Sequence, residues 1–108
     1  MIIVTSDNIV HMKIVKTLGL VRGNTIRARH IGRDIAAGFR NLVGGEIKEY
    51  TKLIAESREQ AIDRMTAEAE ELGANAIIMT RFSTSELMRG AAELLVYGTA
   101  VIVEEDND

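Results

Sequence analysis

The chain has 108 residues, of which 46% are hydrophobic and 27% charged, and its formal net charge is −3 at pH 7. This is the composition of an ordinary globular protein, and it excludes an intrinsically disordered chain. The sequence contains no cysteine, which excludes thiol catalysis, disulfides and thiolate ligands for a metal.

The length predicts a single domain covering residues 1–108, and the acidic run at 104–108 is expected to be a frayed, solvated tail. A domain this small without disulfides favours the reducing cytoplasm. Residues 1–5 lack the features of a secretory signal. No apolar run approaches the roughly 20 residues that a membrane span requires. The net acidic charge argues against a nucleic-acid partner.

The first part of the chain predicts extended structure. Residues 2–5 form a short strand, and the β-branched run at 9–21 forms a long one. Gly19 indicates a bulge or a close approach of another backbone. Gly23, followed by asparagine, indicates a turn or a sharp bulge, after which residues 25–29 resume an extended course.

The apolar period then changes from two to about 3.6, which predicts helices. A short helix is expected over residues 31–42, ended by the glycine pair at 44–45. A long helix is expected over residues 46–72, with Gly73 as its C-terminal stop. Leu53 and Ile62 widen its apolar stripe, which consists of Ile47, Tyr50, Ile54, Ala61, Met65, Ala69 and Leu72.

Two strands complete the chain, one at residues 75–84 and one at 92–103, joined by a connection over 85–91. The predicted order is therefore β-β-α-α-β-β. This order predicts an α+β fold, a two-layer sandwich in which an antiparallel sheet packs on one long and one short helix.

Two features predict a homo-oligomer. The long helix would span about 40 Å, whereas a compact chain of this length has a diameter of roughly 34 Å, so part of the apolar stripe should extend past its own sheet. The strand at 92–103 is apolar on both faces, so something should cover the second face. A neighbouring subunit would do so, and the alternative is that the N-terminal strand and loops of the same chain cover it.

A cluster of arginines precedes the first predicted helix. The N-terminus of a helix presents free amide donors and a partial positive charge, and arginines beside it make an anion or phosphate site. The alternative is a set of structural ion pairs between subunits. The predicted ligand-binding residues are Arg27, Arg29, His30, Arg33 and Asp34.

Other chemistry has weaker support in the residues. His11 and His30 are the only histidines, so a metal site would have to combine His30 or carboxylates from several subunits around a symmetry axis. An enzyme with a site shared between subunits could use Asp34 or Glu46 as a base. No catalytic motif is present, which favours a non-enzymatic protein that binds a small anion or a cofactor at its subunit interfaces, and the residues do not identify the cofactor.

Several segments resemble the YbjQ-like family of uncharacterised bacterial and archaeal proteins. They are RDIAAGFRNLVGG at residues 33–45, the pair Glu49-Tyr50, LGANA at 72–76 and YGTAV at 97–101. The resemblance covers nearly the whole chain. It implies a dodecin-like subunit with an antiparallel sheet, assembled into a homopentameric ring, and it brings a family label of "putative heavy-metal-binding". It implies no reaction, so no catalytic residue is transferred.

Overall fold

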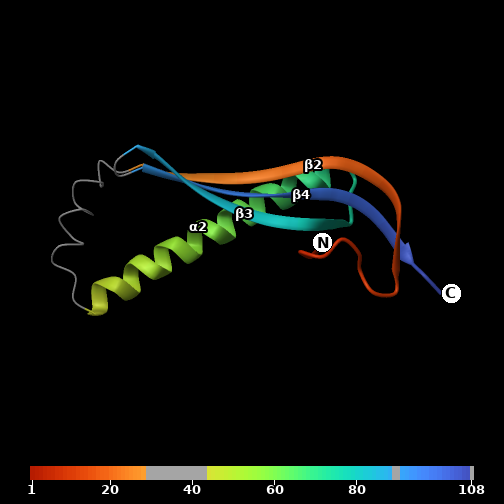
Figure 1. Ribbon diagram of the computed structural model, residues 1–108, viewed down its shortest axis with the longest axis horizontal. Helices are drawn as coiled ribbons and strands as arrows, with labels where there is room; N and C mark the ends of the chain where they lie inside the picture. The colour runs from red at the N-terminus through yellow and green to blue at the C-terminus, as the bar shows by residue number, and fades with distance from the viewer. Residues whose placement is uncertain (29–43, 89–90, 108) are drawn as a thin grey trace.

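The computed structural model describes residues 1–28, 44–88 and 91–107. Its elements form one mixed sheet, in the order β1-β3-β4-β2, with a long helix against one face (Figure 1). This confirms an α+β fold, while the short helix expected over 31–42 lies outside the described residues. In chain order the elements are β1 Ile2–Ile3, β2 Met12–Ala28, α2 Gly44–Glu71, β3 Ala76–Met88 and β4 Ala91–Glu105.

The prediction that the sheet is wholly antiparallel is wrong. Strand β4 is antiparallel to both β2 and β3, but β1 runs parallel to β3, with Ile2 opposite Ala76 and Ile3 opposite Ile77. Strands β1 and β3 are separated in sequence by β2 and α2, so no tight turn imposes an antiparallel direction on them.

Strand β2 is one continuous strand that contains two irregularities. The register with β4 shifts between Ile14 and Lys16 and again between Thr17 and Gly19. Gly19 has a φ of 122°, which confirms the predicted bulge. The turn expected at Gly23 is wrong, because β2 pairs with β4 there without a shift. Gly23 instead lies beneath the helix backbone, where a side chain has no room.

Helix α2 is 28 residues long and begins two residues before its predicted start. Gly73 follows it with a φ of 85°, and the amide of Ala74 donates to the carbonyl of Ala69 over 3.0 Å. These features confirm the predicted glycine stop. The helix buries a stripe with a spacing of four, which consists of Ser57, Ala61, Met65 and Ala69.

The main core lies between α2 and the sheet. Ala61, Met65 and Ala69 of the predicted stripe are fully buried there, but Ile54 is 37% exposed and Leu72 is 47% exposed. The sheet and its connections contribute Val21, Ile77, Val96 and Ala100, with Ile3, Leu18, Ile62 and Ala74 packed around them.

A second, smaller core lies on the opposite face of the sheet. Val101 and Val103 of β4 are buried there with Ala76 and Ile78 of β3. Val4 and Ile9, from the chain between β1 and β2, and Met12, the first residue of β2, cover them. Coverage by the same chain, the alternative to a neighbouring subunit, therefore accounts for this end of the second face.

Strands β3 and β4 are longer than predicted. The connection expected over residues 85–91 is wrong, since β3 continues to Met88 and pairs with β4 down to Ala91. No glycine or proline interrupts residues 76–89, so nothing in the sequence ends the strand earlier. Strand β4 likewise runs through Glu105, which pairs with Met12 and lies inside the predicted tail.

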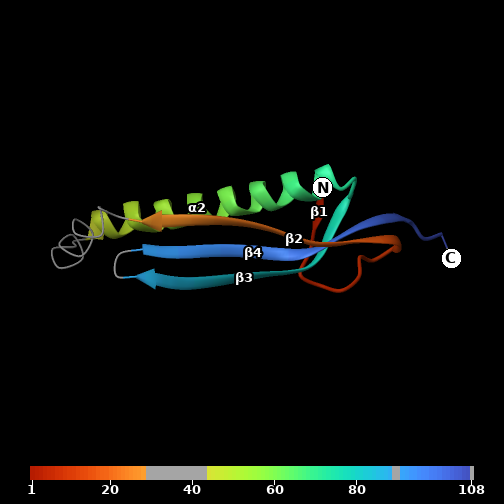
Figure 2. The same cartoon turned by 90° about the horizontal axis from the view of Figure 1, so that it is seen from above.

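The molecule is elongated, with extents of 59 × 24 × 17 Å and a radius of gyration of 17.6 Å. A compact chain of this length has a radius of gyration near 13 Å. Figure 1 shows the N-terminal end of α2 diverging from the sheet, and Figure 2 shows α2 running along the β2 side of the sheet. The N-terminal part of the helix therefore departs from its own sheet by divergence and not by length, because the molecule is 59 Å long and exceeds the compact diameter on which the prediction from helix length rested.

Asn75 joins the end of α2 to the last strand. Its side-chain amide donates to the carbonyl of Val103 over 2.9 Å, and its side-chain oxygen accepts from the amide of Val103 over 2.8 Å. Removal of the Asn75 side chain would leave the amide and the carbonyl of Val103 without these partners. We therefore expect Asn75→Ala to lower the free energy of unfolding by about 1–2 kcal/mol. Urea unfolding measures this, with the chain-end variant Asn107→Ala as control. Equal midpoints for both variants would contradict the expectation.

Candidate functional site

The structure describes only the first of the predicted anion-binding residues. Arg27 lies near the end of β2, opposite Ala92 of β4. This is the far end of the sheet from the N-terminal segment, where β2 and β3 end and β4 begins. The predicted anion site therefore stays a prediction, and the members outside the described residues are Arg29, His30, Arg33 and Asp34.

The other polar candidates do not form a site among the described residues. His11 is exposed at the turn before β2 and has a left-handed φ of 64°. Glu46 falls in the first turn of α2, but its side chain is not described. Within residues 1–28, 44–88 and 91–107 no group of three or more histidines and carboxylates could hold a metal ion. The described helix is not long and apolar enough to cross a membrane.

On the sheet face opposite α2, the described residues leave one half without a covering segment. Leu20 of β2 is 62% exposed and Ile26 is 53% exposed. In the register of β2 with β4, Tyr97 lies between them on the same face and is partly exposed. Leu95, two residues earlier on β4, also lies on this face and is half-buried. The N-terminal segment covers this face only over Val101 and beyond. We call Leu20, Ile26, Leu95 and Tyr97 the open face.

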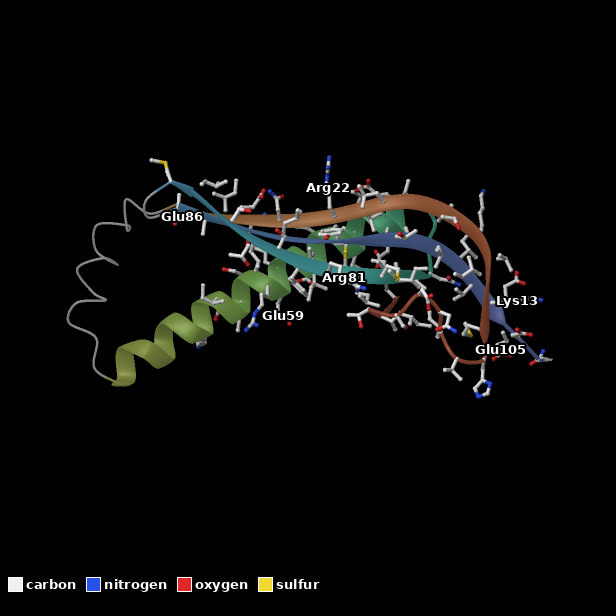
Figure 3. The ribbon with its side chains drawn as sticks, in the orientation of Figure 1. Lys13, Arg22, Glu59, Arg81, Glu86 and Glu105 are labelled. Carbon is white, nitrogen blue, oxygen red and sulfur yellow. The ribbon has the colours of Figure 1, made fainter. Side chains whose placement is uncertain are left out.

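Two arginines lie on either side of Tyr97 on the open face. Arg22 of β2 and Arg81 of β3 are both cross-strand partners of Tyr97. Arg81 is held by the N-terminal segment, since its Nη1 donates to the carbonyl of Thr5 over 2.9 Å. Arg22 projects away from the sheet (Figure 3). The two guanidinium groups therefore point in different directions. Although the two arginines are neighbours across the strands, they do not form an anion site.

The outer edge of β3 is also uncovered in the part of the chain that the structure describes. The N-terminal segment bonds to the edge of β3 as far as Thr80, whose amide donates to the carbonyl of Val4 over 3.1 Å. Every residue from 81 to 88 is exposed. We call residues 81–88 the β3 edge. An unprotected edge of this length is a template for pairing with another strand.

Helix α2 is displaced toward the opposite edge of the sheet. Its contacts are with β2 and, to a smaller extent, β4, and the view from above shows it alongside β2, away from β3 (Figure 2). Phe82 of β3 is on the helix-facing side, because its partner Val96 belongs to the main core. Phe82 is nevertheless 48% exposed, since α2 does not reach it.

These features form a surface suited to protein association, with exposed apolar groups on both faces and an unpaired edge. The sequence did not reveal the full length of the β3 edge, because residues 85–91 were predicted to be a connection, and it did not reveal the exposure of Phe82, which depends on the position of α2. The signal was the lack of any glycine or proline between Ala76 and Arg89.

Comparison with known proteins assigns the chain to a family. A family model described as "Putative heavy-metal-binding" matches residues 1–104. A UPF0145 protein of Dehalococcoides mccartyi strain 195 is 61% identical over 104 residues, covering 96% of this chain and 100% of the relative. A UPF0145 protein of Clostridioides difficile strain 630 is 55% identical, covering 99% and 96%. The chain belongs to this UPF0145, or YbjQ-like, family, as its sequence resemblance predicted.

A solved structure shares the fold. It is a protein of unknown function of the DUF74 family from Pediococcus pentosaceus, with a TM-score of 0.64 and 16% sequence identity. The match covers 96% of this chain and 98% of that protein. At this identity the likeness concerns the fold and not the chemistry of a site.

Proposed function

We propose that the chain works as a non-enzymatic homo-oligomer that binds a small anion where its subunits meet. The observation that carries the oligomer is the elongated shape, in which a helix lies toward one edge of a sheet that exposes apolar groups on both faces. An isolated subunit of this shape leaves Leu20, Ile26 and Phe82 in water. Association would bury them. The YbjQ-like resemblance implies five copies in a closed ring.

The anion would bind beside the arginines at residues 27–33. Support comes from sequence, because three arginines of this stretch have no acid between them, and from the position of Arg27 at the end of β2. Guanidinium groups bind phosphate-like anions through paired, charge-assisted hydrogen bonds. In a ring, copies of this segment from adjacent subunits would raise the local positive charge.

Native mass spectrometry and a thermal-shift screen test the two parts separately. We expect a discrete oligomer in the first, and in the second a rise in melting temperature with phosphate or nucleotides. The double variant Arg27→Gln, Arg33→Gln should lose the rise, whereas Arg58→Gln, an exposed arginine on α2, should keep it. A monomer would overturn the oligomer, and a rise that survives in the double variant would overturn the anion site.

The family description favours one alternative, a metal site with ligands contributed by several subunits. Without cysteine such a site would use imidazole and carboxylate groups, which suit zinc, copper or nickel. Elemental analysis of the protein purified without a histidine tag decides between the two. Metal in a fixed ratio to the oligomer, lost in His30→Ala but retained in His11→Ala, would support the metal site. Substoichiometric metal that is unchanged in both variants would rule it out.

A further inference from the structure

The β3 edge specifies the kind of partner that could complete it. Residues 81–88 are exposed, and one side of this strand has no neighbour in the described part of the chain beyond Thr80. Unpaired amides and carbonyls along a strand pair best with another extended strand. Neither proline nor lysine, which often block such edges, occurs in residues 81–88.

The other edge of the same sheet has a matching geometry. Strand β2 is the terminal strand on the far side of β4, and β2 and β3 are both antiparallel to β4. They therefore run in the same direction. If one copy is placed beside another by rotation about an axis along the strands, the β3 edge of one copy meets β2 of the next in parallel. Repetition of this step closes a ring in which the β3 edge of every subunit is paired.

The position of α2 in one copy is complementary to the uncovered part of β3 in the next copy. Helix α2 lies beside β2 and reaches past it on the side away from β3 (Figure 2). On the same face of the sheet, Phe82 of β3 has no helix over it and is 48% exposed. A neighbouring β3 placed next to β2 would bring its Phe82 beneath the part of α2 that overhangs.

We propose that the β3 edge of each subunit pairs with the outer edge of β2 in a second copy of the chain, and that α2 of that copy covers Phe82. This inference rests on the proposed homo-oligomer and specifies its interface. The interface is head-to-tail, so each subunit uses two different surfaces, and the open face of one subunit continues into that of the next.

One hydrogen bond at the outer edge of β2 must break for this pairing to form. The carbonyl of Asn24 accepts a hydrogen bond from Nη1 of Arg64 on α2, an exposed side chain. A neighbouring strand would supply a backbone amide to this carbonyl instead, and Arg64 is free to turn into solvent. The exchange replaces one hydrogen bond by another and leaves no buried group unpaired.

Cysteine cross-linking tests the pairing directly, because the chain has no cysteine of its own. Ser83 on the β3 edge is changed to cysteine in one sample, and Leu20, Arg22 or Ile26 of β2 in others, all of them exposed. We expect a disulfide when Ser83→Cys chains are mixed and reassembled with one of the β2 variants, and none in any single variant by itself. A chain carrying both cysteines should give a ladder of covalent oligomers.

Phe82→Asp tests the contact with the helix. We expect it to weaken association by at least about tenfold, as for a buried aromatic at the centre of an interface, while the circular dichroism of the subunit is unchanged. Val10→Asp is the matched control, because Val10 is a more exposed apolar residue in the loop before β2. It should leave association unchanged.

The outcomes separate this inference from the proposed function. A monomer in native mass spectrometry overturns both. A discrete oligomer without a disulfide at any of the β2 positions, or with association unchanged in Phe82→Asp, overturns the edge pairing and leaves the oligomer standing. A disulfide in Ser83→Cys by itself would show a two-fold β3–β3 contact and also overturn the head-to-tail arrangement.

Discussion

Replacement of Gly23 by alanine is expected to lower the free energy of unfolding by about 3 kcal/mol or more, because the added methyl group has no space. An ideal Cβ at Gly23 would lie 2.5 Å from the amide nitrogen of Met65, and closer still to the carbonyl oxygen of Ala61. Both are backbone atoms of α2, so no side chain can rotate away. The helix would have to move off the sheet over its most buried contacts.

Gly73→Ala is the control that separates a clash from the ordinary cost of replacing glycine. Gly73 has a φ of 85°, but open space surrounds the position of its Cβ. Its replacement should cost only about 1 kcal/mol of backbone strain. Urea unfolding of both variants at one fixed protein concentration makes the comparison, since association adds to apparent stability. Equal losses in the two variants would mean that α2 approaches β2 less closely than the structure shows.

The two glycines of β2 show what a sequence can and cannot predict. Gly19 and Gly23 both interrupt a β-branched run, and the same rule predicted a local irregularity at each. The rule was right at Gly19, where the register shifts, and wrong at Gly23, where it does not. What distinguishes them is a helix that comes more than 30 residues later in the chain. Local pattern contains no information about such a contact.

Local pattern was most reliable for the long helix. The apolar period of this helix, its length and the glycine at its C-terminal end could all be predicted from the sequence, because each depends on neighbours within a few residues. Its buried stripe was only half right. Ala61 and Met65 are buried as predicted, but Ile54 is exposed and Ser57 is buried in the same turn of the stripe. Among the helix side chains that the structure describes, those buried against the sheet begin at Ser57.

The sequence predicted only part of the surface formed by the open face, the β3 edge and Phe82. An apolar second face on β4 was visible in the sequence, and the structure divides it between a part covered by Val4, Ile9 and Met12 and an open part around Tyr97. The displacement of α2 toward β2 could not be foreseen, since it depends on the packing of the whole sheet. Exposure of Phe82 follows from that displacement.

Met65→Ala is expected to produce the other large loss, about 2–5 kcal/mol in the free energy of unfolding. Met65 is the largest of the fully buried side chains among the residues that the structure describes. It lies where α2 crosses β2, in one core cluster with Val21 and Val96. Truncation removes most of a side chain from a site bounded by two backbones in close contact. The surroundings can collapse only slightly, and a cavity remains.

The matched control for Met65→Ala is Leu72→Ala, which removes a similar apolar side chain from the same predicted stripe. Leu72 is 47% exposed, so its loss should be below about 1 kcal/mol. Because Met65 fixes the helix on β2, its truncation should also loosen the overhanging part of α2 and weaken assembly. Unfolding is therefore followed over a range of protein concentrations. If Met65→Ala lowered stability but left association unchanged, the helix would not be part of the subunit interface.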